Sequence, residues 1–407
     1  MKKIAAIILV FTVILSGCHS PSTSGVNEKQ NQKKKAPPKE KVLSKEEIEK
    51  EQDLAKSDFD KMIQAVDKND KEQFLSFQND ADKLFYKEQD AWLLGVKQKR
   101  REGWTVSEVI NDITVTSQSK GSIELQVNMK RKDETYKNRI TYPIVKVDGR
   151  WKINDLPFKK KIDGPIHFYY LPTLQWEAES VYKDVEKLID VYKEQFIWEP
   201  KEVNIKLYDS LEALSASVPW ESLYGVSTPI SLKFFVEKPY TDITFSLMKH
   251  EVVHSMLVEL SNDNAPNFMQ EGLAMFISDA IKKEPSGTIT FNLDGASTER
   301  ENIILKNIKK FKPISQLNMN YTENAEDIYG LGYLVTNYLI TTYGMDKYLE
   351  MLNELKKEAT IDSENENKEQ IIFKRAINAM EKTYGPINKL SKAYAEYFNK
   401  KKQEIKE

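Results

Sequence analysis

The chain is poor in cysteine and histidine, the side chains that most often bind metals. Its 407 residues contain one cysteine and four histidines. Because the cysteine lies at position 18, the rest of the chain has no internal disulfide and offers no thiolate to a metal or a substrate. A catalytic or metal site must therefore be built from carboxylates, hydroxyl groups and the few histidines.

An excess of charge of one sign is also missing. The 60 lysine and arginine residues nearly balance the 62 aspartate and glutamate residues. This balance gives no extended basic field, so we expect no nucleic-acid partner. With 40% hydrophobic residues, the chain is long enough to bury two cores of ordinary size.

The longest apolar run lies at the N-terminus. Lys2 and Lys3 precede an uncharged run from Ile4 to Leu15, which is too short to span a bilayer but typical of a secretion signal. The run ends in Leu15-Ser16-Gly17-Cys18, which resembles a bacterial lipobox. The resemblance implies removal of residues 1–17 and lipidation of Cys18, hence an extracytoplasmic protein anchored to the cell membrane. The alternative is an ordinary cleaved signal with a chance cysteine.

Residues 18–43 are expected to be a disordered tether. After Cys18 they are rich in Pro, Ser, Gly, Asn and Gln, and they carry six lysines against two glutamates. Such a composition buries too little apolar surface to offset the entropy of ordering. The lysines either contact anionic lipid headgroups or belong to a merely soluble linker.

Helical periodicity followed by alternation predicts a first α+β domain at residues 44–160. Ser44 to Glu47 has capping-box spacing, and a second helical stretch is expected from Lys71 to Arg100 with an interruption near Asn79. Asp148-Gly149 between alternating runs predicts a hairpin. The pattern resembles the NTF2-like cone fold. It contains no catalytic constellation, so a spacer, or a docking domain for a protein partner, is the expected role.

A second domain is expected at residues 161–407, with a small sheet and a mostly helical part. The pattern predicts an amphipathic helix from Trp176 to Phe196 and a half-buried strand from Val203 to Leu207. Further strands are expected at 166–170 and 230–236. The overall fold class is therefore α+β with two domains.

The strongest motif is His250-Glu251-Val252-Val253-His254. It lies in a stretch without Gly or Pro, and four residues of helix place both histidines on one face, where they can bind one zinc ion. Glu251 can then accept a proton from the attacking water and pass it to the leaving amine. The alternative is a pair of core histidines bonded to carbonyl groups.

A third ligand must be a carboxylate or His167, because no other histidine follows His254. Glu271 stands seventeen residues further on, one turn into a helix that Pro266 and Asn267 can open. A helical hairpin can bring it onto the histidine-bearing face. The alternative is an exposed helix glutamate.

Together, the histidine motif and Glu271-Gly272-Leu273-Ala274 resemble the gluzincins, the zinc metallopeptidases of the MA clan that include membrane alanyl aminopeptidases and thermolysin. The resemblance implies one Zn²⁺ per chain, held by His250, His254 and Glu271, with Glu251 as the base. It also implies a tyrosine that stabilises the oxyanion, for which Tyr329 is favoured and Tyr333 is the alternative. In this fold an edge strand borders the cleft, a role expected for 230–236 unless that strand is interior.

The sequence departs from the gluzincin pattern in two places. No Gly-x-Met-Glu-Asn motif precedes the zinc helix, and the interval offers only Glu221 and Glu237, which favours an endopeptidase over an aminopeptidase. Met275 replaces the carboxylate that orients the first histidine in thermolysin-like enzymes, so orientation is expected from Gln270 or Asp279.

The sequence therefore predicts a zinc-dependent peptidase that acts on peptides or proteins at the outer face of the membrane. The alternative function is a catalytically inactive, peptidase-like binding lipoprotein. A third possibility is a structural lipoprotein whose histidine pair is coincidental.

Overall fold

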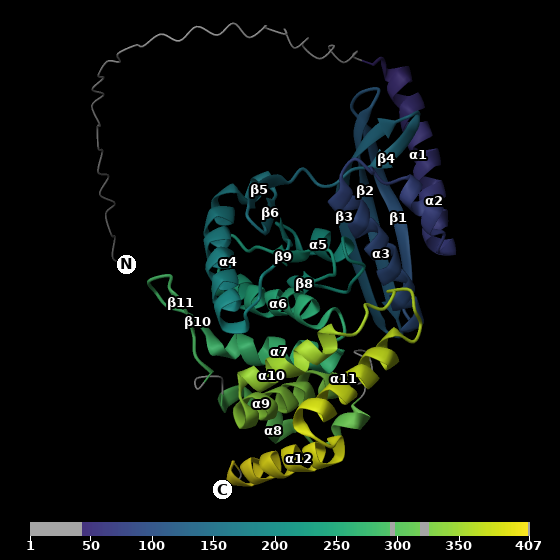
Figure 1. Ribbon diagram of the computed structural model, residues 1–407. Helices are drawn as coiled ribbons and strands as arrows, with labels where there is room; N and C mark the ends of the chain where they lie inside the picture. Colours follow the sequence, from purple (N-terminus) through teal and green to yellow (C-terminus); the bar gives the residue numbers. More distant parts are fainter. Residues whose placement is uncertain (1–42, 294–297, 318–324, 406–407) are drawn as a thin grey trace, which may run out of the picture. The chain divides into compact units, whose positions relative to one another are not determined.

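The computed structural model describes residues 43–293, 298–317 and 325–405 (Figure 1). The predicted signal, Cys18 and the tether up to residue 42 lie outside the described residues, so these assignments stay predictions. Residues Lys41–Glu407 form one compact unit. Among the described residues, no helix combines the length and hydropathy of a membrane span.

Two hydrophobic cores confirm the α+β, two-domain fold class. One core runs from Ala55 to Ile153 and also takes in Ala216. The other runs from Ile166 to Phe398. We call the parts built on these cores the first and second domains; the predicted boundary near residue 160 stays a prediction.

The first domain packs three helices on an antiparallel sheet. Its helices are α1 (Lys45–Lys68), α2 (Lys71–Ser76) and α3 (Lys83–Arg101). Its strands, in sheet order, are β1 (Thr105–Val115), β2 (Lys120–Arg131), β3 (Glu134–Val147) and β4 (Arg150–Ile153).

Local signals predicted this domain well. The capping box is present, with Ser44 Oγ accepting from the Glu47 N–H and Glu47 accepting from the Ser44 N–H. The predicted helix interruption near Asn79 and the Asp-Gly hairpin are confirmed. Asp148 and Gly149 both have positive φ, at 51° and 80°, as a tight hairpin turn requires.

A small cavity of about 10 Å³ lies inside the first domain, which is room for about one water molecule. Gln78 and Glu108 line it, and one side-chain oxygen of each has no hydrogen-bond partner among the described residues. Burial, with a smaller contribution from the negative charge of Asp67, raises the pKa of Glu108 to about 8. Glu108 is therefore a neutral acid over most of the physiological pH range.

We expect Glu108→Gln to stabilise the chain above pH 8 and to lose this advantage toward pH 4.5. The folded-state pKa lies above the ordinary value of 4.5, so the wild-type chain loses stability as pH rises between these values, at most about 1.4 kcal/mol per unit of pKa shift. Urea unfolding at pH 5, 7 and 9 measures the difference. Glu49→Gln, on the exposed face of α1, is the control, and a difference independent of pH would contradict the prediction.

The second domain begins with a five-stranded sheet. Its order is β5 (Lys159–Asp163), β6 (Ile166–Tyr170), β7 (Val203–Tyr208), β9 (Leu232–Phe235) and β8 (Gly225–Ser227). The three inner strands are parallel and both edge strands are antiparallel to their neighbours. Helix α4 (Gln175–Phe196) connects β6 to β7, and α5 (Leu211–Ala216) follows β7.

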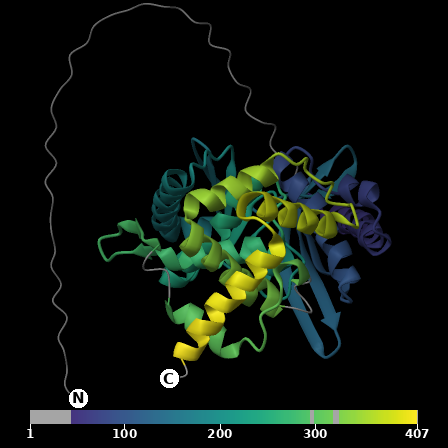
Figure 2. The ribbon, with the colours of Figure 1, turned by 60° about the horizontal axis from the view of Figure 1, so that its bottom comes forward.

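The rest of the domain is mostly helical. Figure 2 brings α11 and α12 to the front, in yellow. The elements are α6 (Asp242–Ser261), α7 (Asn267–Ala280), β10 (Ile281–Lys283), β11 (Ile289–Phe291), α8 (Thr298–Asn307), a π-helical segment (Glu326–Leu331), α9 (Gly332–Tyr343), α10 (Met345–Lys356), α11 (Lys368–Tyr384) and α12 (Ile387–Glu404).

One expectation about the sheet is wrong, and one alternative that the sequence left open is decided. All six residues of β7 are buried, not half of them, because the first domain covers the second face of this strand. Lys206 of β7 bonds there to Glu88 of α3 and, at 2.7 Å, to Asp155. The strand near 230–236 is interior, since β9 lies between β7 and β8, and the short strand β8 forms the edge.

The junction between the domains is polar as well as close. Trp92 Nε1 donates to the Ala216 carbonyl at 2.9 Å, and the Asn138 side-chain amide donates to the carbonyls of Trp220 and Glu221 at 2.8 Å each. Together with the bonds of Lys206 to Glu88 and Asp155, these bonds provide partners for buried polar groups of both domains. The first domain thus packs directly on the sheet whose edge borders the candidate site.

Candidate metal centre

Helix α6 carries the histidine motif in its middle. It extends unbroken from Asp242 to Ser261, as a stretch without Gly or Pro predicts. The rings of His250 and His254 lie next to each other, with centroids 4.9 Å apart. The spacing of four residues thus has its expected effect, since residues one helical turn apart share a face.

A tight turn brings Glu271 to these rings. Asn262 ends α6 in the left-handed conformation, with φ of 53°, and α7 begins at Asn267 after Pro266. Glu271 is buried one turn into α7. Its Oε2 lies 3.0 Å from His250 Nε2 and 3.8 Å from His254 Nε2. Among the described residues, these three side chains form the one group with metal-ligand spacing, with ligand atoms within 4.8 Å of one another.

Two of the three separations between the ligand atoms can be compared with those around a zinc ion. Atoms about 2.0–2.1 Å from a tetrahedral zinc lie roughly 3.3–3.4 Å from each other. The two separations from Glu271 Oε2, 3.0 and 3.8 Å, fall on either side of that spacing. Two imidazoles and one carboxylate are also a donor set found in catalytic zinc sites.

Gln270 fixes the tautomer of His254. Its Oε1 lies 3.2 Å from His254 Nδ1, while its amide nitrogen donates to the Ala265 carbonyl at 3.4 Å. Since a carbonyl oxygen can only accept, His254 Nδ1 carries a proton, and when the imidazole is neutral its Nε2 has the lone pair that a metal ligand needs.

We therefore expect Gln270→Leu to weaken zinc binding about 10–100-fold, because the imidazole loses the group that orients it. Competition with a chromophoric chelator measures the affinity. Gln316→Leu, in a one-turn helix away from the centre, is the control. Equal affinities in all three proteins would show that Gln270 does not orient the ligand.

The other sequence candidates lie elsewhere. Asp279 accepts two bonds from Arg300, at 2.6 and 2.8 Å, and is not in the group around the histidines. His167 lies on β6, where its Nδ1 is 3.8 Å from a carboxylate oxygen of Glu202. Of the alternatives left open by the sequence, the structure thus places Gln270 and Glu271 at the centre.

Glu251 lies between the histidines and the sheet edge. Burial raises its pKa to about 7, the positive charge that His254 can carry lowers it, and the Glu271 carboxylate raises it again. The backbone N–H of Ser227, in edge strand β8, bonds to its carboxylate. This contact places the carboxylate beside the edge of the sheet.

The two candidate tyrosines have different surroundings. Tyr329 is partly exposed in the π-helical segment, and burial together with the charges of Glu271 and Glu251 raises its pKa. Tyr333 is fully buried, and its ring packs against Phe276. The charges that act on Tyr333 come from Asp279, Glu301 and Arg300, not from the histidine centre. Of the two tyrosines, Tyr329 is therefore the one whose pKa responds to both site carboxylates.

Glycine contacts that the sequence did not point to hold the helices together. A Cβ on Gly272 would lie 2.3 Å from the Gly332 carbonyl oxygen, and one on Gly332 would lie 2.4 Å from the Phe268 carbonyl oxygen. Helix α7, which carries Glu271, therefore touches α9 backbone to backbone. The Glu-Gly and Gly-Leu-Gly sequences are the only local signals of this contact.

A second contact missed from sequence fixes α6. Lys249, next to the first histidine, donates to the carbonyls of Ser278 and Ile281 at 2.8 and 3.1 Å. Tyr192 of α4 donates to the Lys249 carbonyl at 2.5 Å. These bonds join the middle of α6 to the end of α7 and to α4.

Comparisons with known proteins add little to this geometry. No family model matches the chain, and neither does any curated protein. Among solved structures, the chain is similar to Legionella pneumophila aminopeptidase A in complex with aspartic acid, with a TM-score of 0.37 and 11% identity over 72% of this chain. The similarity spans 32% of that protein's length. At this level the likeness assigns neither a fold family nor an activity.

Proposed function

We propose that the second domain is a zinc-dependent peptidase of the gluzincin type. The observation that carries the proposal is the convergence of His250, His254 and Glu271, with Glu251 and Tyr329 acting electrostatically on the same centre. A zinc ion held there would supply a Lewis acid that activates water and polarises the substrate carbonyl.

The protein groups have complementary roles in amide hydrolysis. Glu251 accepts the proton of the attacking water and transfers it to the leaving nitrogen, so the carboxylate ends the cycle as it began. Tyr329 donates a hydrogen bond to the carbonyl oxygen as negative charge develops on it. Its raised pKa keeps the phenol protonated for this role.

The substrate is proposed to bind along β8. In the part of the chain that the structure describes, β8 pairs with β9 alone, and its Ser227 N–H contacts Glu251. An extended peptide can add to such an edge through main-chain hydrogen bonds. The peptide bond would then lie beside the base. Strand β8 would thus have the role of edge strand at the cleft that was expected for the strand at 230–236.

An endopeptidase is favoured over an aminopeptidase. The two glutamates upstream of α6 that could hold a substrate amine have other partners. Glu221 pairs with Lys99 of α3 at 3.2 Å, and Glu237 accepts from Thr241 Oγ1 at 3.1 Å. We further propose that the enzyme acts at the outer face of the membrane, anchored through Cys18.

Metal content and cleavage together test the function. Wild-type protein should retain one zinc per chain and cleave peptides with blocked N-termini, whereas His254→Ala should do neither. Zinc retention without cleavage across a broad peptide library would instead support the inactive binding lipoprotein. Absence of zinc after loading at neutral pH would exclude the peptidase and leave a lipid-anchored binding protein as the better account.

The tyrosine pair offers a matched test within this experiment. We expect Tyr329→Phe to lower kcat about 10²–10³-fold, as the loss of one oxyanion donor does, without changing zinc content. Tyr333→Phe removes a hydroxyl four residues away that faces Asp279 and Arg300, and should leave kcat nearly unchanged. A loss of kcat in Tyr333→Phe alone would reverse the assignment.

A further inference from the structure

Trp176 is an unusual surface residue. It lies in the first turn of α4 and its side chain is 87% exposed. The other five tryptophans are buried or half-buried. A large, rigid, amphipathic ring without a packing role inside the chain indicates a contact outside it.

Lysines and an exposed isoleucine lie on strand β5, whose first residue contacts the start of α4. Lys159 Nζ donates to Oε1 of Gln175, the residue before Trp176, at 2.5 Å. Lys159 begins β5, which pairs with β6 alone among the described residues, and Ile162 of the same strand is 55% exposed. We define the α4–β5 patch as Lys159, Lys160, Lys161, Ile162 and Trp176.

The charge of the patch is positive at its edge. Three consecutive lysines are the first three of the five residues of β5. Of the nearby acidic groups, Glu179 pairs with Lys183 at 3.4 Å, whereas Glu177 and Asp163, which accepts from the Tyr182 hydroxyl at 3.1 Å, keep their charges against the three lysines. The patch therefore combines an apolar ring and an aliphatic side chain with cationic groups, as surfaces that contact anionic bilayers do.

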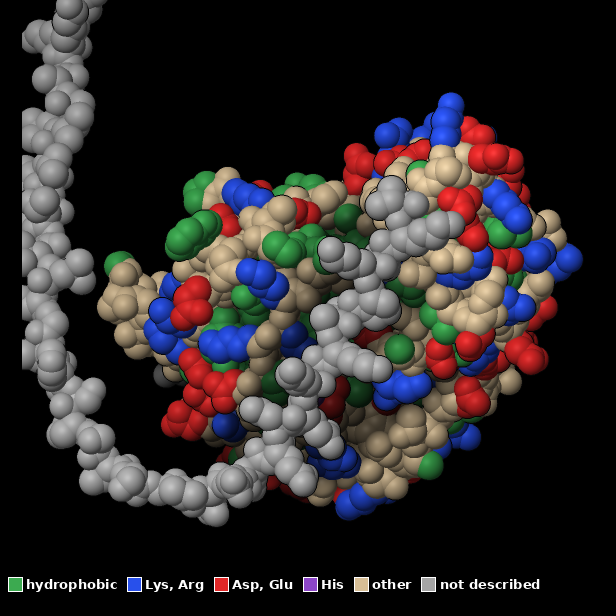
Figure 3. All heavy atoms as spheres, turned by 90° about the horizontal axis from the view of Figure 1, so that it is seen from above, with side chains coloured by type: hydrophobic (Ala, Val, Ile, Leu, Met, Phe, Trp, Pro, Cys, Tyr) green, Lys and Arg blue, Asp and Glu red, His purple; other side chains and the backbone are tan. Residues whose placement is uncertain are grey.

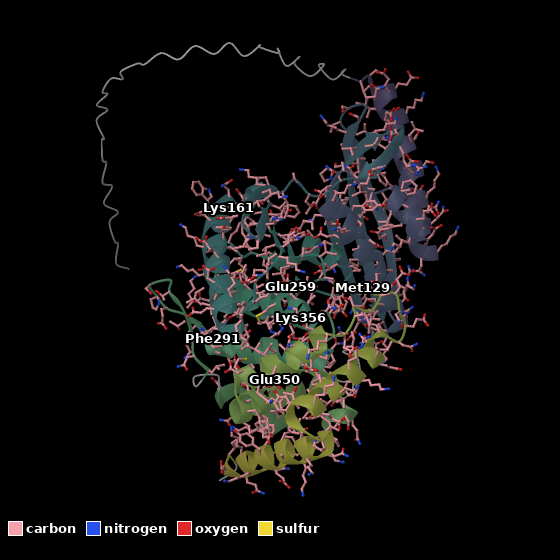
Figure 4. The ribbon with its side chains drawn as sticks, in the orientation of Figure 1. Met129, Lys161, Glu259, Phe291, Glu350 and Lys356 are labelled. Carbon is pink, nitrogen blue, oxygen red and sulfur yellow. The ribbon has the colours of Figure 1, made fainter. Side chains whose placement is uncertain are left out.

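The position of the patch fits this partner. Figure 1 shows β5 and the start of α4 toward the same upper side as the beginning of α1, and Figure 4 labels Lys161 there. Helix α1 starts at Lys45, directly after the segment predicted to link the chain to a lipid. Figure 3 looks onto this side and shows hydrophobic and basic side chains close together on it.

We infer that the α4–β5 patch docks the folded chain on an anionic membrane surface, with Trp176 and Ile162 inserted at the headgroup level and the lysines against lipid phosphates. Trp and Lys side chains are suited to this boundary, since each has an apolar body and a polar end. Docking would fix the orientation of the second domain above the membrane. The inference is independent of peptidase activity.

Vesicle binding of the unlipidated chain tests this inference. The protein is the chain from residue 18 with Cys18→Ala, and the vesicles contain phosphatidylcholine with or without phosphatidylglycerol. Because Trp176 is the most exposed tryptophan, aqueous iodide should quench it preferentially. Anionic vesicles should shift the emission to the blue and protect it from iodide. Neutral vesicles should have a much weaker effect.

Matched variants assign the binding to the patch. Replacing Lys159, Lys160 and Lys161 by Gln should lower the partition coefficient on the order of 10–100-fold, since each lysine near an anionic surface contributes about a fivefold factor. Trp176→Ser should lower it about tenfold. Ile197→Asn is the control, because Ile197 is 81% exposed at the opposite end of α4 and occupies a left-handed position that Asn accepts.

Three results would overturn the inference. One is sedimentation with vesicles that the patch variants leave unchanged, which would assign binding to the lysine-rich tether. Another is a blue shift that depends on protein concentration without vesicles, which would make the patch a contact between copies. The third is no protection of Trp176 by anionic vesicles at low salt. Circular dichroism of every variant ensures that the fold is retained.

Discussion

Glu251→Gln is expected to lower peptide-bond cleavage about 10²–10⁴-fold while the protein retains one zinc per chain. The substitution keeps the size of the side chain, and its carbonyl oxygen can still accept from the Ser227 N–H. It removes only the capacity to take up a proton from water. Zinc content by mass spectrometry and kcat on a cleaved peptide give the two readouts.

Glu259→Gln is the matched control for this substitution. It removes the same charge from the same helix, but its carboxylate accepts from Trp198 Nε1 at 3.0 Å, away from the ligand group. We expect its kcat to remain within a few-fold of wild type. If Glu251→Gln and Glu259→Gln had the same kcat, Glu251 would not be the base. Loss of zinc from Glu251→Gln would indicate that this carboxylate helps to hold the ion.

The ligand helices could be predicted because their signals are local. Four-residue spacing sets the relation of His250 to His254, and Pro266 with the turn before it sets the start of α7. Both depend on backbone geometry within about twenty residues. The choice of metal ligands followed from composition. With one cysteine and four histidines, few side chains were available to complete the metal site.

The parts that could not be predicted depend on distant segments. Strand β7 reads as half-buried because Asn204 and Lys206 alternate with apolar residues, yet the first domain supplies Glu88 and Asp155 to the lysine. The edge strand β8 has only three residues, too few for a periodic pattern. The sequence of neither strand shows whether another part of the chain packs against it.

The choice between Tyr329 and Tyr333 illustrates the same limit at short range. Four residues apart in a regular α-helix, both hydroxyls would lie on nearly the same face. The π-helical segment from Glu326 to Leu331 changes that register before α9 begins. Such segments are frequent at functional sites, but they come from packing and not from a sequence pattern.

Gly332→Ala is expected to reduce kcat about 100-fold and to destabilise the fold by about 1–3 kcal/mol. The added Cβ would lie 2.4, 3.1 and 3.2 Å from the carbonyl oxygen, the carbonyl carbon and the Cα of Phe268, all of them backbone atoms of α7. No rotamer change relieves such contacts, so α7 and α9 must separate. Glu271 lies three residues after Phe268 and Tyr329 three before Gly332. One methyl group therefore displaces both a metal ligand and the oxyanion donor.

Gly330→Ala separates this steric effect from the general effect of losing a glycine. Its Cβ would meet nothing closer than 3.7 Å, so it should fold normally and keep its kcat. Urea unfolding, zinc affinity and kcat are measured for both variants. We expect Gly332→Ala alone to lose zinc affinity together with kcat, because the position of Glu271 changes. Wild-type kinetics in Gly332→Ala, or equal damage in Gly330→Ala, would show that the α7–α9 contact does not set the geometry of the centre.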